Sequence, residues 1–188
     1  MPIRVAGFAG SLSSPSRTRA LVDLVAERAA VRFDALAASY DLTDLQPSLG
    51  QAATLDDLAP LSRAIVDSIL SSDALIVGSP VYKGTYTGLF KHVFDLIDPA
   101  ALAGKPVLLA ATGGGDRHAR VIEHQMRPLF GFFEAAVLPT GAYAGAADFR
   151  DGRPSEALLA RLDRAVEQFA PWLAPRERHR PAAAATAA

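Results

Sequence analysis

Two kinds of apolar pattern alternate along this chain. Short uninterrupted apolar runs, such as residues 3–9 and 74–78, are typical of strands that are buried on both faces of a sheet. Between these runs, apolar residues recur at helical spacing among charged ones, as Leu21, Leu24 and Val25 do. The alternation predicts a parallel sheet whose strands are joined by right-handed helical crossovers, in an α/β sandwich of three layers.

The pattern predicts five strands and five helices. Strands are expected at residues 3–9, 32–40, 74–78, 106–111 and 136–143. Helices are expected at residues 17–30, 58–70, 89–97, 121–135 and 156–173, with a surface loop at residues 41–56. Pro128 is expected to kink or restart the fourth helix. Residues 1–174 are predicted to form one domain, and residues 175–188, rich first in arginine and then in alanine, to be disordered.

Composition narrows the classes of function. The chain has 188 residues, half of them hydrophobic, which is enough for one sizeable core. Its 19 basic and 20 acidic residues give a net charge of -1, so no nucleic-acid partner is expected. It has no cysteine, which excludes disulfides, thiolate metal sites and dithiol redox chemistry, and its four histidines show no metal-ligand spacing. Any redox chemistry would need a bound cofactor.

The chain also carries no signal for secretion or for membrane insertion. Gly7 and Gly10 interrupt the first apolar run, unlike the apolar region of a signal peptide. Charged residues or glycines cut every later run well below the length of roughly 18 residues that spans a membrane. We therefore expect a cytoplasmic protein with no membrane partner.

The loop at residues 10–18 is rich in groups that bind anions. It carries four serines, Arg17 and Thr18 as the first predicted helix begins. Hydroxyls, backbone N–H groups and a helix N-terminus together bind phosphate. The simpler interpretation is that Ser14, Ser16 or Thr18 caps the helix, although one cap needs neither five hydroxyls nor an arginine. Because the loop has neither a GxxxxGK(S/T) nor a GxGxxG motif, it favours a monophosphate.

Two further loops are expected at the same edge of the sheet. Residues 78–86 bring two tyrosines and a lysine to the end of the third strand, and residues 112–118 contain three consecutive glycines. The former can pack against a planar ring, and the latter lets a ligand approach the backbone closely. Their simpler interpretations are a proline-rigidified turn and a flexible connector. Because ligands of open α/β sheets bind beyond the carboxyl ends of the strands, the three loops are expected to form one cleft.

Three segments of the chain resemble one known family. They are SLSSPSRT, GSPVYKGTYTGLFKHVFDLID and ATGGG, which together are similar to the NADPH-dependent FMN reductases. HARVIEHQMRPLFGFFEA and LPTGAYA resemble in particular the flavin reductases of two-component alkanesulfonate and methanesulfonate systems. The resemblance covers residues 3–172 and implies a flavodoxin-like fold with the strand order 2-1-3-4-5.

The resemblance also implies an activity and a site. It implies an NAD(P)H:FMN oxidoreductase that passes a hydride from nicotinamide C4 to flavin N5, with NADPH or NADH as donor. Reduced FMN would supply a separate FMNH2-dependent monooxygenase of sulfonate metabolism. No side-chain acid, base or nucleophile is expected, because stacked rings suffice for hydride transfer. The FMN-binding residues that the resemblance implies are Ser11, Ser16, Arg17 and Thr18 at the phosphate, Pro80, Val81, Tyr82, Lys83 and Gly84 along the isoalloxazine, and Thr112, Gly113, Gly114 and His118 at the polar edge of the ring.

Three further features concern the nicotinamide and the assembly. Arg117 and Arg120 are candidates for the 2′-phosphate of NADPH, with a solvated surface as the equal alternative. Some alkanesulfonate-type relatives carry an inserted tyrosine that marks a π-helix at a tetramer interface, and this chain has His124 there. A homodimer or homotetramer is predicted, because the helix at residues 89–97 is too apolar for an exposed face.

Two other functions fit the same loops. FMN that stays bound could pass electrons to a quinone, an azo dye or a metal oxyanion, and the tightness of FMN binding separates this function from flavin supply. A flavodoxin-type electron carrier without nicotinamide activity is the third hypothesis. Such carriers are usually strongly acidic, whereas this chain is nearly neutral.

Overall fold

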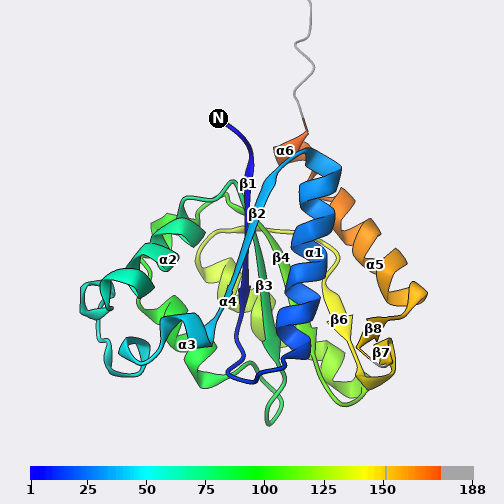
Figure 1. Cartoon of the computed structure of the whole chain (residues 1–188), viewed down its shortest axis with the longest axis horizontal. Helices are drawn as coiled ribbons and strands as arrows, with labels where there is room; N and C mark the ends of the chain where they lie inside the picture. Colours follow the sequence, from blue (N-terminus) through cyan, green and yellow to red (C-terminus); the bar gives the residue numbers. More distant parts are fainter. Residues whose placement is uncertain (151, 175–188) are drawn as a thin grey trace, which may run out of the picture.

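A parallel sheet forms the centre of the protein, as the computed structural model in Figure 1 shows. The strand order confirms the predicted flavodoxin-like topology 2-1-3-4-5. The structure describes residues 1–150 and 152–174, so the disorder predicted for residues 175–188 lies outside it. From edge to edge the strands are β2 (Leu36–Asp41), β1 (Arg4–Ala9), β3 (Ala74–Pro80), β4 (Pro106–Thr112) and β5 (Ala136–Val137), and β6 (Ala142–Ala144) also pairs with β4.

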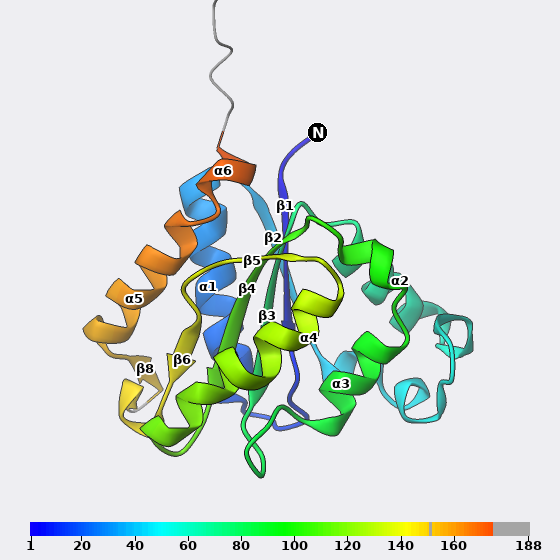
Figure 2. The ribbon, with the colours of Figure 1, turned by 180° about the vertical axis from the view of Figure 1, so that it is seen from behind.

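Helices cover both faces of the sheet, which confirms the three layers (Figures 1 and 2). One face carries α1 (Arg17–Phe33), α5 (Glu156–Glu167) and α6 (Ala170–Leu173). The other face carries α2 (Pro60–Leu70), α3 (Gly88–Asp95) and α4 (Arg127–Phe132). Across residues 1–150 and 152–174, we find no helix with the length and apolar character that a membrane crossing requires.

Shorter elements complete the connections. An antiparallel hairpin of β7 (Phe149–Arg150) and β8 (Arg153–Pro154) joins β6 to α5. The loop predicted at residues 41–56 contains three 3-10 turns rather than an irregular path. The 3-10 turns of the structure are Leu42–Leu45, Ser48–Gln51, Leu55–Asp57, Pro99–Leu102, Asp116–Arg120 and Ala146–Asp148.

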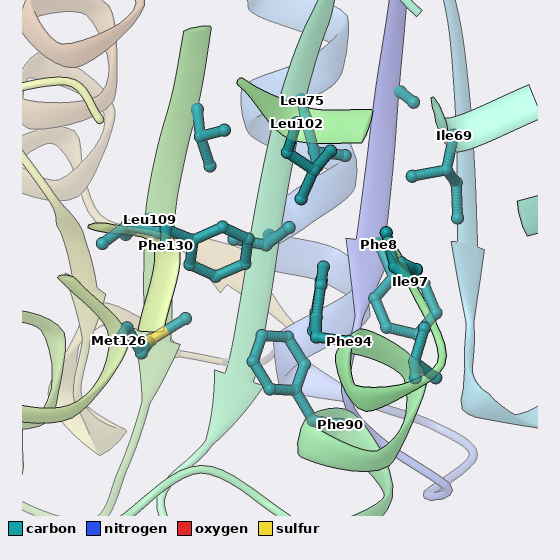
Figure 3. Close-up of a cluster of buried hydrophobic side chains, with 14 of the residues drawn as sticks. Phe8, Ile69, Leu75, Phe90, Phe94, Ile97, Leu102, Leu109, Met126 and Phe130 are labelled. Atoms are coloured by element: carbon teal, nitrogen blue, oxygen red, sulfur yellow. The ribbon is translucent and has the colours of Figure 1, made fainter. Parts of the chain in front are cut away.

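Side chains of each central strand alternate between two hydrophobic cores. In β3, Leu75 and Val77 face α2, α3 and α4, whereas Ile76 faces α1 and α5. Figure 3 shows the first of these cores, in which the ring centroids of Phe90 and Phe94 are 4.9 Å apart. Because both faces of the strands are buried, their sequences are continuous apolar runs.

The apolar run that predicted subunit association lies inside this chain. Phe90, Val93, Phe94 and Ile97 are buried in the core between α3 and the sheet, and Leu89 is partly buried. The core of a single chain therefore explains the run, which lends no support to an interface.

The second predicted strand begins too early. Residues 32 and 33 complete α1, whose buried face continues from Ala26 and Ala29 to Phe33 at helical spacing. The helix ends at Asp34, which adopts a left-handed conformation with φ 50°. The strand β2 begins only at Leu36. The predicted start was too early because a short apolar run at the end of a helix is compatible with the spacing of a helix and with that of a strand.

The predicted fifth strand is divided into β5 and β6. Val137 pairs with Val107 near the start of β4, and Ala142 pairs with Ala110 near its end. The chain therefore advances five positions, from Val137 to Ala142, along a length that β4 covers in three, from Val107 to Ala110. Pro139 lies in the interruption, where it has no N–H to donate to a ladder of hydrogen bonds.

The fourth predicted helix changes its hydrogen-bonding pattern midway. A π-helical turn, Ile122–Met126, contains the exposed His124, and α4 follows at once. Pro128 lies in the first turn of α4, where a missing N–H costs little, so the predicted restart is confirmed. The last predicted helix likewise divides into α5 and α6.

Candidate functional site

A cleft opens at the carboxyl end of the sheet, where β1, β3 and β4 lead into three loops. Its volume is about 280 Å³. Because the three loops approach from different strands, residues far apart in the sequence share this one cleft. The lining residues are Ser11, Ser13, Pro15, Ser16, Arg17, Thr18, Pro80, Val81, Tyr82, Thr112, Gly113 and Gly114.

Ten of the thirteen residues expected to bind FMN line this cleft. The other three, Lys83, Gly84 and His118, belong to the same loops but lie outside the lining. Ser13 and Pro15 line the cleft and were missed by the sequence analysis. The available signal for them was the composition of the whole serine-rich loop, because no single position stood out. Contact of these residues with a flavin stays a prediction.

The first loop leads directly into the N-terminus of α1. Ser16 caps the helix, because its Oγ accepts a hydrogen bond of 3.1 Å from the backbone N–H of Arg19. The capping interpretation is therefore right for Ser16. Within the described residues, the backbone N–H groups of Arg17 and Thr18 find no acceptor, as expected in the first turn of a helix. They are open donors at the positive end of a helix dipole.

The two arginines at the start of α1 have different surroundings. Arg19 is held by Asp23 at 2.9 Å, by Asp41 at 3.2 Å and by the carbonyl of Ser39 at 2.8 Å. The exposed Arg17 makes no side-chain hydrogen bond or ion pair in the part of the chain that the structure describes. Arg19 therefore ties α1 to the end of β2, and Arg17 is the cation available to a ligand in the cleft.

A buried pair of hydroxyls joins the first loop to the third. Thr18 Oγ1 and Thr112 Oγ1 lie 2.7 Å apart, and both residues are buried. Thr18 is therefore fixed by β4 rather than used as a cap.

Thr112→Val is expected to destabilise the fold by about 1–3 kcal/mol, because it leaves the buried Thr18 hydroxyl without a partner. The double variant Thr18→Val/Thr112→Val replaces both hydroxyls by methyl groups and should recover most of this loss. Urea unfolding of the two single variants and the double variant measures the coupling. Purely additive losses would show that the two hydroxyls do not pair.

The second loop forms a tight turn at the mouth of the cleft. Tyr82 and Thr85 exchange backbone hydrogen bonds of 3.0 and 3.2 Å. Lys83 and Gly84 between them have φ angles of 54° and 89°, the left-handed pair of a type I′ turn. The turn lies at the lower edge of the molecule in Figure 1, after β3. It directs Lys83 away from the lining and leaves Tyr82 57% exposed beside the cleft.

The third loop is held from behind by two aromatic side chains. The Tyr143 hydroxyl donates a hydrogen bond of 2.6 Å to the carbonyl of Gly115, and burial raises the pKa of this hydroxyl. His118 packs against Gly113, and its Nδ1 is buried without a hydrogen-bond partner among the described residues. His118 therefore supports the loop, and Gly113 and Gly114 form the wall of the cleft.

The residues of this cleft fit a flavin mononucleotide. One end offers the hydroxyls of Ser11, Ser13 and Ser16, the Arg17 guanidinium and two open backbone N–H groups, a donor set suited to a phosphate dianion. The other end offers Pro80, Val81 and Tyr82, which are apolar or aromatic, opposite a glycine edge. This polarity matches a molecule with a phosphate at one end and a flat ring at the other.

A mononucleotide cleft at the carboxyl edge of a 2-1-3-4-5 sheet defines the class of flavodoxin-like flavoproteins. Residues 3–149 match the family described as NADPH-dependent FMN reductase. The chain belongs to this family. It is an oxidoreductase with FMN and NAD(P)H as its cofactors, which confirms the predicted family, enzyme class and cofactors.

Relatives along nearly the whole chain support the same assignment. The FMN reductase (NADPH) of Pseudomonas aeruginosa is 45% identical over 171 residues, which are 90% of this chain and 92% of that protein. The NADH-dependent FMN reductase SfnF of Pseudomonas fluorescens is 44% identical over 171 residues, 90% of this chain and 91% of that protein.

Solved structures share the fold over similar lengths. An oxidoreductase from Corynebacterium diphtheriae superposes with a TM-score of 0.83 at 33% identity and covers 92% of this chain and 97% of its own. An NADH:FMN oxidoreductase, EMOB, in its apo form gives a TM-score of 0.78 at 26% identity over 93% of this chain and 92% of its own.

Proposed function

We propose that this enzyme reduces FMN as a diffusing substrate and supplies reduced FMN to a separate FMNH2-dependent monooxygenase of sulfonate metabolism. The observation that carries the proposal is the exposure of the cleft. Ser13, Pro15, Arg17, Tyr82 and Gly114 line it and are all exposed. Because these groups already face solvent, FMN can enter and leave the cleft without any opening of the fold, as a diffusing substrate must. The sulfonate partner rests on the resemblance of residues 118–144.

In this proposal the phosphate of FMN lies at the N-terminus of α1. Ser11, Ser13 and Ser16 donate hydroxyl hydrogen bonds, and the backbone N–H groups of Arg17 and Thr18 add two more. Ser16 can do so because its Oγ accepts from Arg19 and still has its own proton to donate. Arg17 neutralises part of the phosphate charge.

The ring of FMN lies between the second and third loops. Tyr82 and Val81 contact one edge, and Gly113 and Gly114 allow the backbone to approach the polar edge without a Cβ in the way. FMN held there by these residues would supply the hydride acceptor for a reduced nicotinamide. The protein positions the ring, and the transfer needs no side-chain acid or base.

Arg17→Gln is expected to weaken FMN binding about tenfold or more, because a charge-assisted hydrogen bond to the phosphate is lost. Riboflavin has the same ring and no phosphate, so its affinity should change less than about twofold. Fluorescence titration measures both affinities. The matched control is Arg164→Gln, which removes an exposed arginine of α5 away from the cleft. An equal loss for riboflavin and FMN would contradict the placement of the phosphate.

A second experiment tests whether the protein releases reduced FMN after turnover. After anaerobic turnover with excess FMN, ultrafiltration should recover reduced FMN in the filtrate in amounts well above the protein concentration. Reduced flavin that is retained with the protein in a fixed ratio would contradict flavin supply and would indicate a bound-FMN oxidoreductase with another acceptor.

We also propose that the enzyme is a homodimer or homotetramer. The family resemblance supports this, as does Phe132 of α4, which is 71% exposed beside the π-helical turn. Sedimentation equilibrium should give two or four times the mass of one chain, 19.8 kDa. The mass of a single chain would contradict association.

A further inference from the structure

The glycine run after β4, residues 113–115, has little stiffness of its own. None of its residues has a Cβ, so each can adopt more backbone conformations than any other residue type. Among the described residues, the backbone N–H groups of Gly114 and Gly115 find no acceptor. Gly113 and Gly114 nevertheless form one wall of the cleft. Contacts from outside the run must therefore fix the position of this wall.

A single side chain ties the run to the sheet. The Tyr143 hydroxyl donates a hydrogen bond of 2.6 Å to the carbonyl of Gly115, and within residues 1–150 and 152–174 no other side chain makes a hydrogen bond to the three glycines. Tyr143 belongs to β6 and pairs with Ala111 of β4. It is buried, with 9% of its surface exposed. The hydroxyl is therefore presented by a strand residue whose position is set by the packed core.

The backbone hydrogen bonds of the run do not replace this tie. The N–H of Gly113 donates to the carbonyl of Ala144 at 3.2 Å, which fixes the first glycine. The carbonyl of Gly115 also accepts from the N–H of His118 at 3.0 Å, but His118 belongs to the same loop. Without the Tyr143 hydroxyl, the last two glycines would have no hydrogen bond to the sheet among the described residues.

Tyr143 also restricts the run by contact. Its hydroxyl lies 2.7 Å from the point that a Cβ at Gly113 would occupy, and Nδ1 of His118 lies 2.8 Å from the same point. These two side chains close one side of Gly113, yet neither of them lines the cleft. Tyr143 therefore acts on a ligand in the cleft through the glycines and not by its own contact.

We propose that Tyr143 is a positioning residue for the flavin ring, because its hydroxyl fixes the glycine wall against which the ring lies. The inference rests on the proposed function, which places the ring beside Gly113 and Gly114 and the phosphate at the N-terminus of α1. A wall that is fixed before the ligand arrives loses less conformational freedom on binding, which strengthens binding. Tyr143 makes no hydrogen bond to the first loop among the described residues, so it strengthens binding of the ring and not of the phosphate.

The test compares FMN with riboflavin, which has the same ring and no phosphate. Tyr143→Phe removes the hydroxyl and keeps the aromatic ring of the side chain. It is expected to weaken binding of both flavins by the same factor, about fivefold or more, as measured by fluorescence titration. The matched control is Tyr40→Phe, because the Tyr40 hydroxyl contacts Ser68 at 3.3 Å outside the cleft. The control should keep both affinities within about twofold of the unchanged protein.

A second substitution separates positioning from a purely structural role. In Tyr143→Phe/Gly115→Ala, the alanine restricts the backbone of the run where the hydroxyl no longer holds it. Gly115 can accept this change, because an added Cβ meets nothing within 4 Å and the backbone is extended, with φ −170°. The double variant should bind riboflavin at least about twofold more tightly than Tyr143→Phe. Urea unfolding of each variant reports the stability of the fold separately.

Three results would overturn the proposal. They are unchanged flavin affinities in Tyr143→Phe, whatever its stability, a loss of affinity for FMN alone, and a double variant that binds riboflavin no better than Tyr143→Phe. Turnover of excess FMN by the unchanged protein separates this inference from the proposed function. If FMN is not turned over, the proposed function fails while the affinities still report on Tyr143. Turnover together with unchanged affinities in Tyr143→Phe refutes this inference alone.

Discussion

Phe90→Ala should lower the free energy of unfolding by about 3–5 kcal/mol, the range for an aromatic side chain deleted from a packed core. Phe90 is fully buried, and its ring centroid lies 4.9 Å from that of Phe94 and 5.6 Å from that of Tyr86. Its backbone N–H is capped by Thr87, whose hydroxyl donates to the carbonyl of Gly10 at 2.9 Å. The Phe90 side chain also packs closely against Gly10 at the start of the first loop, so its removal should loosen that loop and weaken FMN binding.

Urea unfolding measures this loss, and Leu61→Ala is the control. Leu61 is a large apolar residue on α2, a helix of the same face, but it is 73% exposed. Its removal should change the free energy of unfolding by less than about 0.5 kcal/mol, as is usual at exposed positions. Similar losses in the two variants would show that the aromatic core is not packed as in Figure 3.

Gly113→Ala should weaken FMN binding about tenfold or more and destabilise the protein by about 1–3 kcal/mol, because the added methyl group has no room. A Cβ at this position would lie 2.7 Å from the Tyr143 hydroxyl and 2.8 Å from the Cβ and Nδ1 of His118. The Tyr143 hydroxyl cannot move without releasing the carbonyl of Gly115. The third loop must therefore shift, and the glycine wall of the cleft shifts with it.

Gly115→Ala is the control for Gly113→Ala. A Cβ at Gly115 has open space around it, and the backbone there is extended, with φ −170°. FMN titration and urea unfolding of both variants should show a loss only at Gly113. If Gly115→Ala weakened FMN binding as much, flexibility of the glycine run rather than crowding at Gly113 would govern the site.

The fold could be predicted where one physical signal dominates. The strands β3 and β4 are buried on both faces, so their sequences are continuous apolar runs that no helix face would show. The predicted boundary between α1 and β2 was wrong. Phe33 belongs to the buried face of α1, while the residues next to it are compatible with the spacing of a helix and with that of a strand. The division into β5 and β6 depends on how these residues pair with β4, which is a tertiary property. Pro139 is compatible with the interruption but does not by itself predict it.

The site could be predicted from loop composition together with one topological rule. The serines near Arg17 and the glycines after Thr112 have nothing in common along the sequence. They meet because the carboxyl ends of parallel strands share one edge. The resemblance implied His118 at the ring edge; in the structure its side chain lies close to Gly113, as does the Tyr143 hydroxyl, and outside the cleft lining. That arrangement could not be derived from the sequence, because it needs the packing of residues 25–30 positions apart.

The central claim, that the enzyme turns over FMN as a substrate, is tested most directly by anaerobic oxidation of NADPH with FMN in large molar excess. The absorbance of both the nicotinamide and the flavin is followed. We expect each protein chain to reduce many equivalents of FMN, in step with NADPH consumption. Reduction that stops at one flavin per chain would contradict the claim and indicate a tightly bound cofactor, and no oxidation of NADPH or NADH would leave an electron carrier.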